Sequence, residues 1–176
     1  MPVEQFDTIE YLASGTLRQV QAYRLLNKYR VIDVLLPFSP ILTGTIPINI
    51  DIESSDLDII CQYTTTDGFS QHLEAKFSVF EDFSIKTLDL AGSTAVLANF
   101  CLDGFPVEVF GQQIPVKQQM AYRHLLIEHQ LLLQKAETFR QQIIDLKKQG
   151  MKTEPAFAVT LGLEGDPYTA LLNFEV

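Results

Sequence analysis

The chain has 176 residues, of which 47% are hydrophobic and 20% are charged, so it suits one globular domain with a buried core. Its 22 acidic and 13 basic residues give a formal net charge of −9. Proteins that hold a nucleic-acid backbone normally present a basic surface, so this charge argues against a nucleic-acid partner. It favours a nucleotide, a small molecule or a protein instead.

No part of the sequence approaches the ~20 consecutive apolar residues of a membrane span. Residues 1–5 lack the basic start and apolar run of a secretory signal. We therefore expect a cytoplasmic protein with no membrane partner. Cys61 and Cys101 each lie in an apolar, strand-like run, and we expect buried free thiols there rather than a disulfide.

The first half of the chain predicts two helices and two strands. Apolar residues recur at helical spacing after a polar N-cap (Ser14 or Thr16), and shorter apolar runs are bounded by proline, glycine and threonine. In chain order, we predict a helix over 16–29, a strand over 41–43, a strand over 57–63, a turn over 64–68 and a helix over 69–80.

The second half predicts three strands and then helices. The strands cover 83–90, 94–102 and 105–110, and Asp103-Gly104 forms a hairpin turn between the last two. A Gln- and Leu-rich region over 115–148 is predicted to be helical, in one or two pieces, before Gly150. Two short helices should begin near Thr153 and Asp166. This order predicts an α+β fold, with a mixed sheet and flanking helices in residues 1–112 and a helical region in 113–176 packed on it as one unit.

The stretch Asp56-Leu57-Asp58-Ile59-Ile60 alternates acidic and aliphatic residues, which places both carboxylates on one face of a strand. The two side chains would leave the strand about 6.5–7 Å apart. Oxygen ligands at this spacing suit Mg²⁺ or Mn²⁺. The alternative is a solvent-exposed edge strand, which would show the same alternation. Glu108, flanked by two apolar residues on a later strand, is the candidate third ligand.

Gly44-Thr45 follows a short predicted strand. Glycine lets the backbone approach a phosphate closely, and the next N–H and hydroxyl can donate to phosphate oxygens. A phosphate-holding turn that leads into a metal-holding strand suits nucleotidyl transfer.

These residues resemble the signature of the nucleotidyltransferase superfamily, which has a polymerase-beta-like fold: Gly-Ser or Gly-Gly, a short gap, acid-hydrophobic-acid, and a later third acid. Gly44-Thr45, Asp56-Leu57-Asp58 and Glu108 match it in order. Over nearly its whole length the chain also resembles a family of small, uncharacterised bacterial proteins assigned to that superfamily. Thr45 stands where the superfamily usually has serine or glycine, and Glu108 stands where it usually has aspartate. The resemblance implies a nucleotidyltransferase-like core.

Two basic residues and two histidines in the second half of the chain are further candidates for the site. Arg123 and Lys152 sit beside strings that match the family, and we predict that they neutralise phosphate charge, with plain surface placement as the alternative. His124 and His129 are five residues apart and do not form a helical metal pair. For His124, packing competes with a place in the site. The leucine-rich runs near 125–133 indicate core packing and leave a homo-oligomer open.

We therefore predict a Mg²⁺- or Mn²⁺-dependent enzyme that transfers a nucleoside monophosphate from an NTP to a hydroxyl of a small molecule or a protein. Asp56, Asp58 and Glu108 would hold the metal and carry the catalysis, while Gly44 and Thr45 would bind the triphosphate. The alternative is a nucleotide- or metal-binding regulatory module without turnover.

Overall fold

The computed structural model describes residues 3–90 and 92–174. Its sheet has five strands in the order β1-β2-β5-β4-β3. β1 is antiparallel to β2, β2 is parallel to β5, and β5, β4 and β3 are antiparallel neighbours. The sheet is therefore mixed, which confirms the predicted α+β class. The strands are β1 (Ile41–Thr43), β2 (Leu57–Gln62), β3 (Glu81–Leu90), β4 (Ser93–Leu102) and β5 (Phe105–Gln112).

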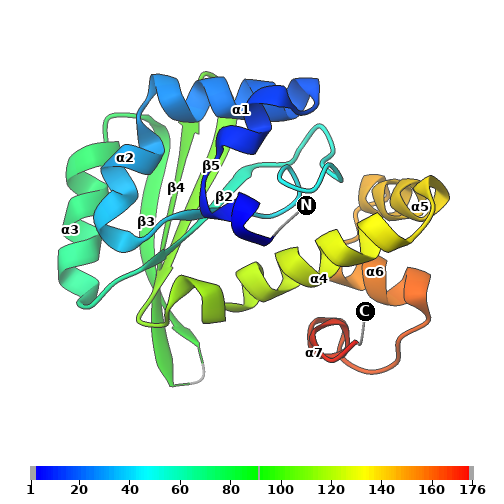
Figure 1. The fold of residues 1–176 in the computed structure, drawn as a ribbon. Coiled ribbons are helices and arrows are strands. Elements are labelled where there is room, and N and C mark those ends of the chain that lie inside the picture. The colour runs from blue at the N-terminus through cyan, green and yellow to red at the C-terminus, as the bar shows by residue number, and fades with distance from the viewer. Residues whose placement is uncertain (1–2, 91, 175–176) are drawn as a thin grey trace.

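Helices flank this sheet and fill the last third of the chain (Figure 1). They are α1 (Leu17–Lys28), α2 (Val31–Leu35), α3 (Thr66–Phe77), α4 (Met120–Gln134), α5 (Glu137–Lys148), α6 (Thr153–Leu161) and α7 (Pro167–Leu172). Thr16 caps α1 in a reciprocal capping box with Gln19, which resolves the choice of N-cap.

The helices differ from the prediction in two places. α2 was not predicted, because five residues are too few for helical periodicity to show. α3 begins at Thr66, three residues before the predicted start, and ends at Phe77. The region over 115–148 forms two helices, one of the two arrangements predicted: Pro115 leads into a short 3₁₀ turn before α4, and the extended backbone of Lys135 and Ala136 separates α4 from α5.

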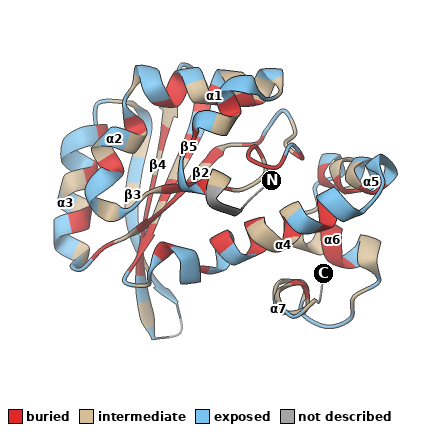
Figure 2. Ribbon diagram, in the orientation of Figure 1, coloured by how far each residue is buried: buried red, intermediate tan, exposed pale blue. Residues whose placement is uncertain are grey.

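The two faces of the sheet are covered by different helices. Leu57, Ile59 and Cys61 of β2 pack in a cluster with residues of α1, α2 and α3. Ile60 points the other way, into a second cluster formed with α4 to α7. Buried residues accordingly follow β1, β2, β4 and β5 and the inward sides of the helices, whereas no residue of β3 is buried (Figure 2).

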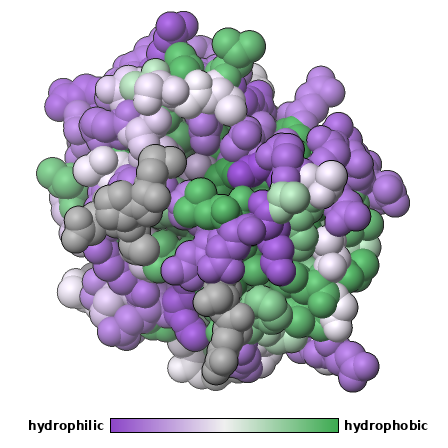
Figure 3. Space-filling model, turned by 45° about the vertical axis from the view of Figure 1, so that its right-hand side comes forward, coloured by the Kyte–Doolittle hydropathy of each residue, from purple (hydrophilic) through white to green (hydrophobic). Residues whose placement is uncertain are grey.

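Asp58 shares the second face with Ile60, so the acids lie where the cover of α4 to α7 begins. Hydrophilic residues cover most of the face shown in Figure 3, and hydrophobic residues gather at its lower right. Both cysteines are free thiols, as predicted, but only Cys61 is buried, and Cys101 is half-buried. None of the described helices has the length and apolar character needed to cross a membrane.

Candidate active site

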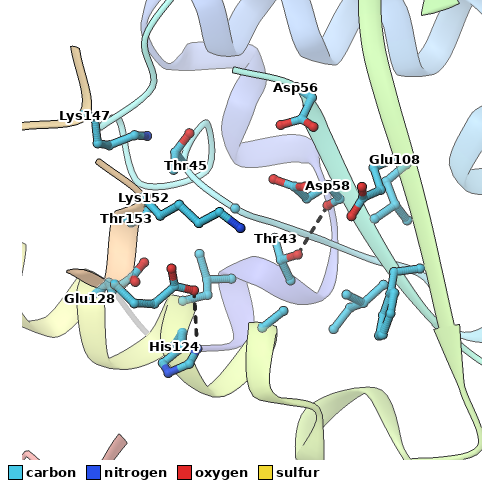
Figure 4. A pocket seen from close by; sticks show the side chains of 17 residues that line it. Thr43, Thr45, Asp56, Asp58, Glu108, His124, Glu128, Lys147, Lys152 and Thr153 are labelled. Carbon is cyan, nitrogen blue, oxygen red and sulfur yellow. Dashed lines mark hydrogen bonds and ion pairs between the residues drawn. The ribbon is translucent and has the colours of Figure 1, made fainter. Parts of the chain in front are cut away.

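The parallel pairing of β2 and β5 brings two of the three predicted acids together. Asp58 is the register partner of Glu108, and on its other side it is the partner of Thr43 in β1. Asp56 immediately precedes β2 and lies on the same side of the sheet (Figure 4). The three carboxylates therefore line one wall of a cavity.

Gly44 forms the turn that follows β1, and two features require glycine there. Its φ of +74° lies in the left-handed region that L side chains rarely adopt. A Cβ at this position would also overlap Oδ2 of Asp58. Gly44 thus lets the backbone pass directly against the central carboxylate.

Thr45 also lines the cavity, and its hydroxyl is already engaged: it donates to Oγ of Ser55 at 3.2 Å. The same Ser55 oxygen accepts the backbone N–H of Ile52 at 3.0 Å. Thr45 therefore closes the loop over 44–56 on itself. A phosphate bound at Thr45 would use its backbone, or would replace the Ser55 contact.

Helices on two sides hold this loop. From α1, the Gln19 amide donates to the carbonyl of Ile46 at 2.9 Å. From α5, Nζ of Lys147 donates to the carbonyl of Ile50 at 2.8 Å. A guanidinium on each helix adds further bonds to loop carbonyls, from Arg18 and Arg140. The loop over 44–56 is in this way a fixed connection between the sheet and the C-terminal helices.

The cavity has a volume of about 430 Å³. Its strand wall carries the acids, and its helical wall carries two lysines, Lys147 and Lys152 (Figure 4). Lys152 was predicted, and its side chain extends into the cavity. The lining residues are Thr43, Gly44, Thr45, Asp56, Asp58, Ile59, Ile60, Glu108, Phe110, Ala121, His124, Leu125, Glu128, Lys147, Lys152, Thr153 and Glu154.

Arg123 lies outside this set: it is exposed on α4 and does not line the cavity. Its neighbour His124 does, and is 4% exposed. The reason is helical phase, because Ala121, His124 and Glu128 share the face of α4 that meets the cavity. Nε2 of His124 lies 3.0 Å from the carbonyl of Tyr168, and Nδ1 lies 3.6 Å from Oε1 of Glu154.

The sequence reasoning missed two buried charged residues, Glu128 and Lys147. Burial raises the pKa of Glu128 to about 8, and the nearby Glu154 adds to the rise. Burial lowers the pKa of Lys147 to about 8, against the attraction of Glu128 and Asp51. Within the described residues, Oε1 of Glu128 has no hydrogen-bond partner. For Glu128, the sequence signal was its spacing of four residues from His124 on an apolar helix face.

The electrostatics of the acids fit a site that receives a cation. Burial raises the pKa of Asp58, and the negative charges of Asp56 and Glu108 raise it further. Burial also raises the pKa of Glu108, and Asp56 adds to this effect, while Lys86 and Lys152 oppose it. Carboxylates that mutually disfavour their charge gain from a divalent ion between them.

The donor set is the hard-oxygen set that Mg²⁺ and Mn²⁺ take. As the side chains stand in the described part of the chain, no group of three or more ligand residues is gathered closely enough to hold a metal ion. The chemistry of the donors fits a divalent ion, and an ion would draw the three carboxylates together.

Comparison with known proteins gives a family and a fold. The model of the family described as "Domain of unknown function (DUF4269)" matches residues 24–174, which include every candidate site residue. No curated protein matches the sequence.

Solved structures share the nucleotidyltransferase fold. A mutant Cid1 poly(U) polymerase bound to MgATP has a TM-score of 0.55 and 12% identity, over 87% of this chain and 53% of that one. Cid1 in complex with the UTP analogue UMPNPP has a TM-score of 0.54 and 13% identity, over 87% of this chain and 52% of that one. The GLD-2/RNP-8 complex has a TM-score of 0.53 and 16% identity, over 91% of this chain and 63% of that one. The chain spans roughly half to two-thirds of these proteins, and at such identities the likeness shows the fold alone.

Proposed function

The chain belongs to the DUF4269 family and has a nucleotidyltransferase-like fold, and from this premise we propose that it transfers a nucleoside monophosphate from an NTP to a hydroxyl group. The observation that carries the proposal is the register of β2 and β5, which sets Asp58 beside Glu108 with Gly44 against the Asp58 carboxylate. Structural neighbours of this fold are described with MgATP and with a UTP analogue, which is consistent with an NTP donor.

Asp56, Asp58 and Glu108 would hold Mg²⁺ or Mn²⁺, which when bound offsets the charge of the triphosphate and orients it. The turn at Gly44 and Thr45 would receive phosphate oxygens through its backbone. Lys147 and Lys152 face this turn across the cavity. They would bind the remaining phosphate charge, a role that the sequence assigned to Lys152 and Arg123.

In the transfer, the acceptor oxygen would attack the α-phosphorus and form a new P–O bond. The bond from that phosphorus to the oxygen bridging to the β-phosphate would break, and pyrophosphate would leave. The hydroxyl proton would pass to the carboxylate of Glu108, which is the acid farthest from Gly44 across the strands.

The first test is binding, because it needs no acceptor. ATP, GTP, CTP and UTP would each be added with Mg²⁺ or Mn²⁺ while thermal unfolding is followed. A nucleotide at 100 times its Kd should add about 2.7 kcal/mol of stability. Asp58→Asn should abolish this gain, whereas Asp33→Asn, an exposed aspartate on α2, should retain it.

The second test is turnover, measured as pyrophosphate release and as transfer of label from an α-³²P NTP. Binding without pyrophosphate release in the presence of an acceptor mixture would favour the regulatory module. Equal nucleotide binding by the parent and Asp58→Asn would contradict the proposed site.

A further inference from the structure

A second, larger hollow adjoins the acidic cavity. It has a volume of about 830 Å³ and shares four wall residues with the cavity: Phe110, Ala121, His124 and Glu154. Because the two spaces share wall residues, a molecule in this groove would lie next to the cavity that contains the carboxylates. We call this space the acceptor groove, with Phe110, Gln112, Gln118, Gln119, Met120 and Tyr168 among its lining residues.

Resting on the proposed function, we infer that the acceptor groove binds the molecule that receives the nucleotide, and that this molecule is a small alcohol with an apolar body and a cationic amine.

The position of the groove supports this assignment. Phe110 is two residues beyond Glu108 on the same face of β5, so the groove begins about 6.5–7 Å along the strand from the Glu108 carboxylate. Gly44 lies on the other side of Asp58, after β1. The acceptor and the triphosphate would approach the acids from opposite sides, as an in-line displacement needs.

The charge of the groove disfavours a phosphorylated acceptor. No lysine or arginine is found among its described lining residues, whereas both Asp89 and Glu154 contribute carboxylates. The lysines face the acidic cavity instead. A phosphate in the groove would meet no lysine or arginine of the described lining, and an ammonium group would be attracted by the carboxylates.

Gln119 lines the groove and carries a buried hydrogen-bond acceptor. Its side chain is 2% exposed, and its Nε2 donates to the carbonyls of Cys61 at 2.9 Å and Ile114 at 3.0 Å. These bonds fix the amide, and its Oε1 has no hydrogen-bond partner in the described part of the chain. An unpartnered buried acceptor calls for a donor, which an amine or a hydroxyl supplies.

The apolar part of the groove is accessible. Met120 at its edge is 50% exposed, and Leu90 is 42% exposed. Together with Phe110 and Ile114 they offer apolar surface for the body of the acceptor. Apolar walls with a few oriented polar groups are typical of small-molecule sites.

The experiment measures binding without nucleotide, so it is independent of turnover. The chain has no tryptophan, so Met120→Trp places a single fluorescent reporter in the groove. The probes are aminohexanol, hexanediol and hydroxyhexyl phosphate, which share an apolar body and a hydroxyl and differ in charge. Val159→Trp, exposed on α6 and away from the groove, is the reporter control.

Aminohexanol should bind most tightly, hexanediol less tightly, and the phosphate about tenfold or more weaker than the amine, which is ~1.4 kcal/mol. Gln118→Lys adds a cation to the exposed edge of the groove and should invert this order. Gln130→Lys adds the same charge to α4 outside the groove and should leave the order unchanged.

Equal affinities for the three probes, tightest binding of the phosphate, or an order unaffected by Gln118→Lys would overturn the inference. Stabilisation by Mg-NTP is measured on the same variants. If the nucleotide stabilises the protein and no probe binds in the expected order, the acceptor groove is wrong and the proposed function stands. If the probes bind as expected and no nucleotide does, the proposed function fails instead.

Discussion

Asp58 and Glu108 are register partners in the parallel pair formed by β2 and β5. Successive residues of a strand point to opposite faces, so a shift of one residue in this pairing would move Glu108 away from the cavity. The aliphatic neighbours Leu57 and Val107 fix the register from the other face, because both are buried in the cluster beneath α1 to α3. The packing of the core thus sets the spacing of the acids.

Gly44→Ala should damage both stability and the site. The left-handed φ of Gly44 strains any L residue, and the added Cβ would overlap the Asp58 carboxylate. We expect a loss of about 1–3 kcal/mol in the free energy of unfolding. Stabilisation by Mg-NTP should also be lost. Urea unfolding with and without Mg-NTP measures both effects.

Gly165→Ala is the matched control for this change. Gly165 also has a positive φ, of +88°, and a Cβ there would have no heavy atom within 4 Å. This variant should lower the free energy of unfolding through backbone strain alone and should retain nucleotide binding. If the two variants behave alike, the contact between Gly44 and Asp58 does not matter to the site.

Alternation and turn chemistry were sufficient to predict the sheet. Each of the five strands was predicted within two residues of its observed ends, because apolar runs between glycine- and proline-containing turns leave little choice. The acids followed from the same alternation, since a strand with one buried face must turn Asp56 and Asp58 together. The phosphate turn followed from a glycine after a strand.

The residues that α4 and α5 contribute to the cavity could not be predicted from alternation and turn chemistry. Whether Arg123 or His124 faces the cavity depends on the phase of α4, which is set by its packing on the sheet rather than by the type of residue. Lys147 was not predicted as a site residue, because nothing local shows that the loop over 44–56 lies against α5. Contacts between segments almost a hundred residues apart leave no periodic signal.

Lys147→Met should weaken nucleotide binding more than it weakens the fold. The variant loses one hydrogen bond to the Ile50 carbonyl, worth about 1 kcal/mol, and gains from removing a buried charge. The loss of a cation that faces the triphosphate should cost about tenfold to a hundredfold in Kd for Mg-NTP. Calorimetric titration measures this loss.

Lys148→Met is the control, since Lys148 is the exposed neighbour on α5. It should bind the nucleotide like the parent. An unchanged Kd in Lys147→Met would assign Lys147 to holding the loop alone.

The stability of the metal-free protein should fall as the pH rises from about 5 to about 8. Glu128 has its pKa raised from 4.5 to about 8 by burial, and the pKa of Asp58 is raised in the same direction. Between these pH values the folded chain holds protons that the unfolded chain has released. Each such group therefore lowers the free energy of unfolding by about 1.4 kcal/mol per pH unit.

Lys147 acts with the opposite sign and in a different window. Its pKa is lowered from 10.5 to about 8, so above pH 8 the unfolded chain holds the proton that the folded chain has lost. Its contribution to stability rises with pH there, which places a minimum of stability near pH 8. Mg²⁺ should make this minimum of stability shallower, because a cation among the acids replaces the proton on Asp58.

Glu128→Gln tests this account, because the amide cannot ionise. The fall in the free energy of unfolding between about pH 5 and 8 should lose the contribution of one carboxyl group. The variant should match the parent near pH 4 and be more stable than it at pH 8. Glu164→Gln, at an exposed position between α6 and α7, should keep the full slope. Urea unfolding followed by far-ultraviolet circular dichroism at a series of pH values gives the comparison. If Glu128→Gln keeps the parent slope, the buried carboxyl is already ionised at neutral pH, and a cation or donor near it compensates its charge.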